Sequence, residues 1–184
     1  MAKTHYDLSL DGNNLTLKVQ NGTPVKLAWP AVALSLNGIE IRPTVPDSPP
    51  VRKNRGLFQR FRLDNVEFMV GIREHNGILT KSVTVSNGSG GPLPVPDYVE
   101  VDRQSVPDPA LRLCGYRASY LLQNDSRGPE EGQGRIPGCG YPLIGNRFFV
   151  GLAHPAAFNT LTEQDDCHSS YVLRHFPQWQ GNKL

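Results

Sequence analysis

The sequence lacks any long apolar run. No stretch approaches the roughly 18 consecutive apolar residues of a membrane-spanning helix, so a membrane is not an expected partner. The first residues, Met1-Ala2-Lys3-Thr4-His5, lead into alternating polar and apolar residues rather than into the apolar core of a signal peptide. We therefore predict a soluble chain. Its compartment is left open, because processing removes an export signal from a mature protein.

Cysteine is also scarce. The three cysteines, Cys114, Cys139 and Cys167, cannot all pair within the chain, and no C-x-x-C pair suggests zinc. Side chains that can bind metals gather in Asp165-Asp166-Cys167-His168, but consecutive residues point in different directions and rarely converge on one ion. We predict no metal site and no cofactor.

The chain has almost no net charge. Lysine and arginine number 19 against 17 acidic residues, which leaves a net charge of +2. This is too little for the positive field with which proteins attract a phosphate backbone, so nucleic acid is not an expected partner. Glycine and proline, in contrast, number 18 and 16, and their abundance predicts many turns.

Amphipathic helical patterns are missing, since no segment longer than about ten residues repeats apolar residues at helical spacing with caps. Alternating apolar and polar residues, which are typical of strands, dominate instead. The predicted strands are 5–10, 15–19, 25–29, 32–36, 58–63, 66–72, 78–85 and 98–102. Strands at this spacing predict an all-β chain with an antiparallel, supersandwich-like β-sandwich and little helix, in one domain over residues 1–184.

Three stretches interrupt this pattern. Residues 43–56 contain four prolines and no periodicity, so we expect an extended, exposed loop there. Residues 87–96 are rich in glycine and proline and separate the strands before them from the strand at 98–102. Residues 107–140 show no regular pattern and are predicted to be irregular.

Residues 138–159 go beyond a generic strand pattern. A turn at Gly140-Tyr141-Pro142 precedes Phe148-Phe149-Val150-Gly151-Leu152-Ala153-His154-Pro155, whose alternation predicts a buried central strand. This segment resembles part of the N-terminal galactose-mutarotase-like β-supersandwich domain of bacterial glycoside hydrolases related to the α-galactosidases. Residues 81–93 are similar to a hairpin of such domains, and residues 171–177 to the strand element that follows.

In that family the supersandwich precedes a barrel whose paired aspartates cleave the glycosidic bond. The resemblance implies a non-catalytic accessory domain that packs against the catalytic barrel of the same parent protein, with a glycan as a further candidate partner. The sequence supplies no barrel and stops at Leu184, where such a sandwich usually has further strands, so we expect a fragment truncated at the C-terminus. Whether the parent is an enzyme is left open; the resemblance implies a glycoside hydrolase.

Candidate catalytic groups are few. Glycoside hydrolysis needs two carboxylates across a cleft, and acidic residues beside turns are usually solvated. Cys139 and His154 are residue types that can serve as a nucleophile and its base. The sequence does not show, however, that these two side chains lie close together. We predict no catalytic site. The carboxylates considered are Asp97, Glu100, Asp102, Asp165 and Asp166.

Sugar recognition uses aromatic faces for stacking and polar side chains for the ring hydroxyls. The candidate carbohydrate-binding residues are Trp29, Tyr141, His154 and Trp179. Two alternatives stay open: Trp29 belongs to a strand and can pack in the core, and Trp179 can cover an adjoining domain. A free-standing carbohydrate-binding module and a structural or assembly sandwich without a sugar ligand are the alternative functions. A large exposed apolar patch near the C-terminal strands is expected only for the accessory domain.

Overall fold

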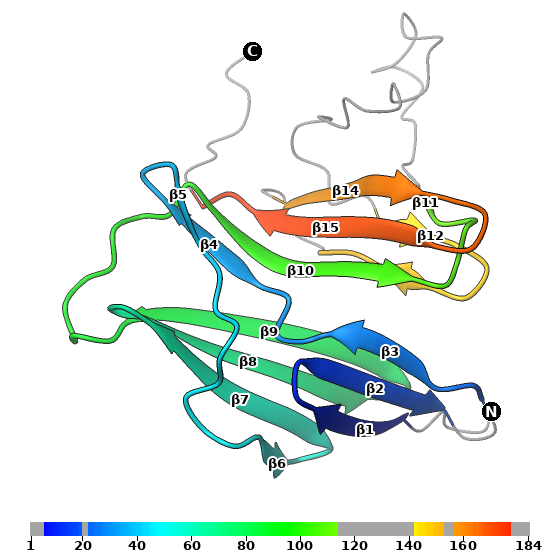
Figure 1. Ribbon diagram of the computed structural model, residues 1–184, viewed down its shortest axis with the longest axis horizontal. Helices are drawn as coiled ribbons and strands as arrows, with labels where there is room; N and C mark the ends of the chain where they lie inside the picture. Colours follow the sequence, from blue (N-terminus) through cyan, green and yellow to red (C-terminus); the bar gives the residue numbers. More distant parts are fainter. Residues whose placement is uncertain (1–5, 20–21, 114–141, 153–156, 178–184) are drawn as a thin grey trace, which may run out of the picture. The chain divides into compact units, whose positions relative to one another are not determined.

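The computed structural model describes residues 6–19, 22–113, 142–152 and 157–177, which form fifteen strands and no helix (Figure 1). The paired strands within each unit run antiparallel, which confirms the predicted all-β, antiparallel sandwich class. In this part of the chain no helix is long and apolar enough to cross a membrane. The chain divides into two compact units, residues 1–95 and 96–184. The prediction of one domain stays a prediction, because two such units can belong to one domain or to two.

Unit 1, residues 1–95, begins with an antiparallel sheet in the order β1-β2-β3. Its strands are β1 (Tyr6–Asp11), β2 (Asn14–Val19) and β3 (Val25–Ala28). The β1–β2 turn uses Gly12 at a φ of +56°, a conformation that glycine adopts without steric cost. Leu8, Leu15 and Leu17 are buried on one face, as their period-two spacing predicts.

The second sheet of unit 1 is a four-stranded meander in the order β6-β7-β8-β9. Its strands are β6 (Val51–Lys53), β7 (Gly56–Leu63), β8 (Val66–His75) and β9 (Ile78–Asn87). Alternate side chains of β7 and β8 make the core of this unit, with Leu57, Phe61, Phe68 and Val70 almost inaccessible to solvent. A separate hairpin joins β4 (Ala33–Leu36) and β5 (Ile39–Ile41).

The prediction of an exposed loop over residues 43–56 is wrong at its C-terminal end. Residues 51–53 form strand β6, which pairs with the start of β7. The hairpin turn is Asn54-Arg55, and both residues have positive φ angles, of 51° and 58°. This is the geometry of a two-residue hairpin loop, but it is made without the glycine that usually signals such a loop. The strand gives no periodic signal either, because all three of its residues are exposed.

The Phe58 side chain lies on the face of this sheet opposite the core, where its ring packs over glycine positions. Phe58 pairs with Gly71 on β8, and a Cβ added at Gly71 would lie 2.5 Å from the Phe58 ring. The Arg73 guanidinium lies 5.5 Å from the ring centroid. The ring therefore fills the space that a side chain at position 71 would need.

We expect Gly71→Ala to lower the free energy of unfolding by about 1–3 kcal/mol, because the ring must leave its position or the strands must separate. Urea titration of both proteins measures this. Gly91→Ala adds a Cβ at an ordinary contact distance of 3.6 Å, without a positive φ, so it controls for the loss of a glycine without a clash. An equal effect of Gly71→Ala in a Phe58→Ala background would contradict the steric explanation.

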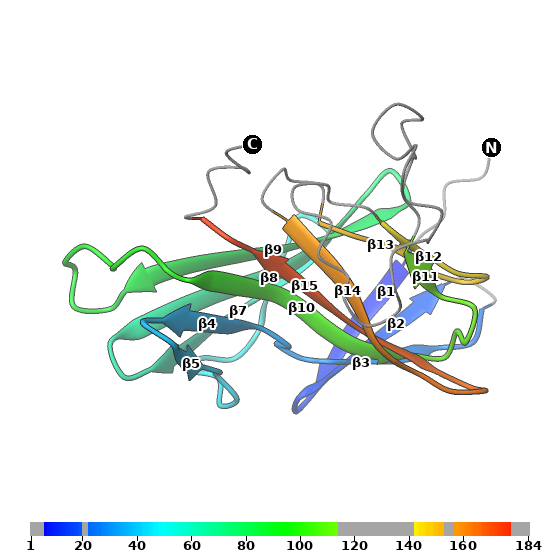
Figure 2. The same cartoon turned by 90° about the horizontal axis from the view of Figure 1, so that it is seen from above.

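Unit 2, residues 96–184, contains three long neighbouring strands in the order β14-β15-β10 (Figure 2). They are β10 (Tyr98–Val106), β14 (Ala157–Gln164) and β15 (Ser169–His175). A second, small sheet pairs β11 (Arg112–Leu113), β12 (Leu143–Ile144) and β13 (Phe149–Val150). The strand at 98–102 is confirmed and continues to Val106, whereas β14 was not predicted.

The prediction of a buried central strand at 148–153 is wrong. Strand β13 contains only Phe149 and Val150, lies at the edge of the described small sheet, and leaves Phe149 74% exposed. The chain turns sharply just before it, since the Gly145 amide donates to the Phe148 carbonyl. The buried carboxylate of Asp108 binds backbone amides of this turn, so the segment is held by a capped turn rather than by a long ladder.

Candidate functional site

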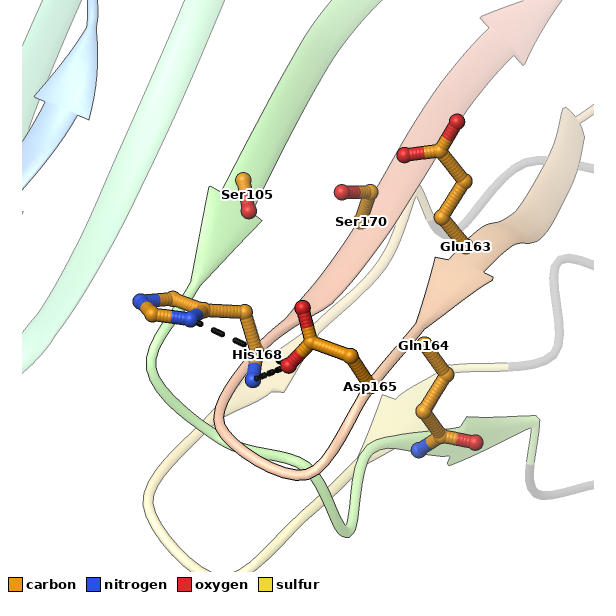
Figure 3. A pocket seen from close by; sticks show the side chains of 6 residues that line it. All are labelled: Ser105, Glu163, Gln164, Asp165, His168 and Ser170. Atoms are coloured by element: carbon orange, nitrogen blue, oxygen red, sulfur yellow. Dashed lines mark hydrogen bonds and ion pairs between the residues drawn. The ribbon is translucent and has the colours of Figure 1, made fainter.

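The candidate site is a groove on the sheet of unit 2, with a volume of about 400 Å³ (Figure 3). Six side chains from β10, β14, β15 and the turn between β14 and β15 line it: Ser105, Glu163, Gln164, Asp165, His168 and Ser170. All of them are polar or charged. The groove is therefore suited to a polar ligand of about the size that small-molecule sites accept.

Three of these side chains form a row across the sheet. Ser105 on β10 pairs with Ser170 on β15, and Ser170 pairs with Glu163 on β14. Residues that pair directly across strands point to the same face of the sheet. Two hydroxyl groups and a carboxylate are thus presented at neighbouring positions, where they can donate to and accept from one ligand.

The turn between β14 and β15 closes one end of the groove. One oxygen of Asp165 accepts hydrogen bonds from the backbone amides of Cys167 and His168, each at 2.7 Å. These two amide bonds lower the pKa of Asp165 below its usual range; burial opposes them, and the nearby His168 side chain adds a lesser lowering effect. Asp165 is therefore an ionised hydrogen-bond acceptor near neutral pH, and its carboxylate points toward the groove (Figure 3).

Gln164 lies at the rim, but its amide group points away from the other five side chains (Figure 3). Its Nε2 donates to the carbonyls of Pro109 and Leu111 and to the Ser169 hydroxyl, the last two at 3.1 and 3.2 Å. The Ser169 hydroxyl in turn donates to the Asp108 carbonyl at 2.6 Å. These hydrogen bonds tie the end of β14 to the 109–111 segment and to Ser169, the residue before Ser170.

Two of the carboxylates considered for catalysis have structural roles. Glu100 is fully buried, and its two oxygens accept hydrogen bonds from Arg103 at 2.9 and 2.7 Å. Arg174 on β15 also donates to Glu100, at 3.2 Å, while its guanidinium lies 4.4 Å from the Tyr98 ring centroid. A carboxylate between two guanidinium groups is fixed as an ion. It is poorly suited to deliver a proton to a glycosidic oxygen.

Asp102 is engaged in a second buried network. The Tyr171 hydroxyl donates to one of its oxygens at 2.8 Å, and the Gln104 amide donates to the other at 2.9 Å. Among the remaining carboxylates, Asp97 is partly buried and Asp166 is exposed on the β14–β15 turn. The structure does not bring these residues together into a pair across a cleft.

Trp29 is the one predicted carbohydrate-binding residue that the described ranges contain. Its side chain is only 3% exposed, and its indole N–H donates to Gln59 Oε1 at 2.8 Å. The Lys81 ammonium lies 5.8 Å from the ring centroid. Trp29 therefore packs in the core, which is the alternative that its strand position favoured. Tyr141, His154 and Trp179 lie outside the described residues, and their role stays a prediction.

The remaining reactive side chains form no further site in the part of the chain that the structure describes. Cys167 is exposed and unpaired on the turn, whereas Cys114 and the Cys139–His154 pair lie outside this part. Among residues 6–19, 22–113, 142–152 and 157–177 no group of three histidine, cysteine or acidic side chains could hold a metal ion. The Asp165–His168 segment instead forms a turn whose own amides occupy one Asp165 oxygen.

Sequence reasoning missed Ser105, Ser170 and Glu163. A single serine on a strand is an ordinary surface residue, and only the pairing of three strands far apart in the sequence makes the row. No local pattern encodes this register, and β14 itself lacked a clear alternating signal.

Comparison with known proteins gives no relative: no family model, no curated protein and no solved structure matches this chain. The apolar patch expected of an accessory domain also finds little support in the described surface of unit 2. Of its residues 96–113, 142–152 and 157–177, Phe149 is the only large apolar side chain that is highly exposed. A single exposed apolar side chain does not mark a docking surface.

Proposed function

We propose that this chain is a non-catalytic β-domain that contacts a glycan; its further role as an accessory domain of a carbohydrate-active enzyme rests on the sequence resemblance and not on an exposed apolar surface. The observation that carries the proposal is the row Ser105, Ser170 and Glu163, with the ionised Asp165 at its end. Sugars offer many hydroxyl groups in fixed positions. A row of hydroxyl and carboxylate groups on a sheet, whose backbone holds their spacing, matches such a ligand.

Two features support binding rather than reaction. A general acid for glycoside hydrolysis needs a carboxyl whose pKa is raised toward neutral pH, and the pKa of Asp165 is lowered by backbone amides. The other buried carboxylates, Glu100 and Asp102, are fixed by arginine, tyrosine and glutamine partners. The groove thus offers hydrogen-bonding capacity, while its Asp165 is poorly suited to act as a general acid.

The binding part of the proposal is tested by replacing one hydroxyl group of the row. The full chain is first screened on an array of neutral oligosaccharides, and the dissociation constant of the best ligand is measured by calorimetry. We expect Ser170→Val to weaken this ligand about tenfold, because one hydrogen bond to a sugar hydroxyl is lost and the sheet face is kept. Glu163→Gln is expected to have a smaller effect, since the amide still accepts.

Ser9→Val is the matched control, because Ser9 is an exposed serine on β1 of unit 1, far in sequence from the groove. It is expected to leave the dissociation constant unchanged. Binding that Ser170→Val and Ser9→Val affect equally would contradict this site, and an array without any bound sugar would contradict glycan binding. The accessory part has its own test: an open reading frame that continues from Leu184 into a catalytic barrel supports it, and a stop codon there contradicts it.

A further inference from the structure

A second groove, of about 430 Å³, lies within unit 1 between strand β1 and the β6–β7 hairpin. It is lined by Tyr6, Asp7, Leu8, Arg52, Lys53, Asn54, Arg55, Gly56 and Glu74. Three cationic side chains from one hairpin therefore surround one hollow, whereas the first groove has acidic and hydroxyl side chains and a single histidine. The second groove therefore favours an anionic ligand, whereas the first does not.

The hairpin turn concentrates the positive charge. Asn54 and Arg55 occupy the two central positions of the turn with positive φ angles, so the chain reverses within two residues. Arg52 and Lys53 precede this reversal, and Arg55 lies within it. Because the turn is this tight, the side chains of Arg52, Lys53 and Arg55 all line the same groove.

The existing contacts of these cations fix two of them and leave the third available. Arg52 donates to the Leu8 carbonyl on β1, and Arg55 lies 3.7 Å from the buried Glu74 carboxylate. Glu74 is itself held by the Gly77 amide at 3.1 Å. Lys53 is exposed and its backbone pairs with Gly56, but its side-chain ammonium has no hydrogen bond or ion pair with any described residue. Glu74 offsets one positive charge, and the exposed Asp7 at the rim offsets part of another.

We propose that this groove binds an anionic sugar unit, whose carboxylate or sulfate group contacts Lys53 and the guanidinium groups of Arg52 and Arg55. Both anions present oxygens that guanidinium and ammonium groups bind strongly. Arg52 and Arg55 are already oriented by Leu8 and Glu74, so little side-chain freedom is lost when the anion binds. This inference rests on the proposed glycan-binding function and extends it to a second, charge-selective site.

The same contacts disfavour an acidic peptide as the ligand. Both β1 and β6 are edge strands of their sheets, and an extended peptide could in principle add to such an edge. However, Arg52 already occupies the Leu8 carbonyl of β1, which an added strand needs for its ladder. A sugar needs only the side chains.

The test measures the binding of three trisaccharides to the full chain by calorimetry: a galacturonate trimer, a sulfated galactose trimer and the neutral galactose trimer. We expect at least one anionic trimer to bind about tenfold more tightly than the neutral one, with an affinity that falls as salt is added. Lys53→Gln with Arg55→Gln is expected to abolish this difference. Lys26→Gln, an exposed lysine on β3 outside the groove, is the matched control and is expected to retain it.

Several outcomes would overturn the inference. They are equal binding of all three trimers, equal losses in the Lys26 and Lys53/Arg55 variants, and a Glu/Asp hexapeptide that binds this groove more tightly than either anionic trimer. Ser170→Val separates this inference from the proposed function. If neutral sugars bind and depend on Ser170 while no anionic trimer is preferred, only the second site fails; if no sugar binds at all, both fail.

Discussion

Asp108→Ala is expected to lower the free energy of unfolding of unit 2 by about 3 kcal/mol or more. Asp108 is only 1% exposed, and its carboxylate accepts hydrogen bonds from the amides of Arg147, Phe148 and Ala110 at 2.6, 3.2 and 3.2 Å. Alanine removes the charged acceptor of three part-buried hydrogen bonds, and a hydrogen bond to a charged group contributes about 1.5–3 kcal/mol. Urea titration followed by circular dichroism measures the loss.

A second measurement ties this loss to the turn at residues 145–148. The amides of Arg147 and Phe148 are expected to exchange hydrogen with solvent faster in Asp108→Ala, because their acceptor is gone. Gly145→Ala is expected to have a similar effect on the same amides, since its Cβ would lie 2.3 Å from Asp108 Oδ2. Asp166→Ala removes an exposed aspartate of the β14–β15 turn and is expected to change the stability by less than about 0.5 kcal/mol. Unchanged exchange at residues 147 and 148 in Asp108→Ala would contradict the capping role.

Acid provides an independent check of Asp108. Burial acts to raise its pKa, but amide hydrogen bonds from Arg147, Asn146, Ala110 and Phe148 together outweigh burial and lower the pKa below 3.8. A carboxyl with a lowered folded-state pKa contributes stability above its unfolded-state pKa, and this contribution is lost as pH falls through the folded-state value. The wild-type protein is therefore expected to lose stability in acid more steeply than Asp108→Ala does.

The strands that sequence patterns predicted correctly have marked turns at both ends. Gly12, Asn37-Gly38 and Asn76-Gly77 all take positive φ angles, which asparagine and glycine tolerate best. These residue types therefore predicted the turns correctly. Asn54-Arg55 takes the same conformation, but arginine is not a turn signal, and β6 was missed for that reason. The alternation over 148–153 was misread because a buried carboxylate distant in sequence, Asp108, controls the chain there.

The candidate site was less predictable than the fold, for a geometric reason. Aromatic residues were the expected sugar contacts, yet Trp29 packs in the core against Gln59. The row of Ser105, Ser170 and Glu163 depends on the register of β10, β15 and β14, and a shift of one residue would turn these side chains to the other face. Register depends on long-range packing, and no local sequence pattern contains it.

Tyr171→Phe is the second substitution with a large expected effect, and the size of this effect depends on pH. At neutral pH we expect it to lower the free energy of unfolding by about 1.5–3 kcal/mol, since the Tyr171 hydroxyl donates to the buried Asp102 carboxylate at 2.8 Å. Phenylalanine removes the Tyr171 hydroxyl as a donor to that Asp102 oxygen. Gln104 continues to bind the other oxygen, at 2.9 Å, so the network is weakened but not lost.

In alkali the difference between the two proteins is expected to shrink. Burial, then the charge of Asp102, then the hydrogen bond to it raise the pKa of Tyr171 far above the ordinary value of 10.0. Above that ordinary value the unfolded chain releases the phenol proton and the folded chain retains it. The wild-type stability therefore falls by up to about 1.4 kcal/mol per pH unit from this residue alone. Tyr171→Phe has no such proton and escapes this part of the loss.

Urea titrations at pH 7, 9, 10 and 11 measure both effects in one series. Tyr6→Phe is the matched control, because Tyr6 is a partly exposed tyrosine on the edge strand β1, and it is expected to keep the wild-type dependence on pH. Parallel curves for wild type and Tyr171→Phe above pH 10 would contradict a phenol that stays protonated beside Asp102. Converging curves would mean that the Tyr171 phenol keeps its proton beside Asp102 in the folded chain. The same arrangement explains how Asp102 can be buried on a strand next to Glu100 without being available for acid–base chemistry.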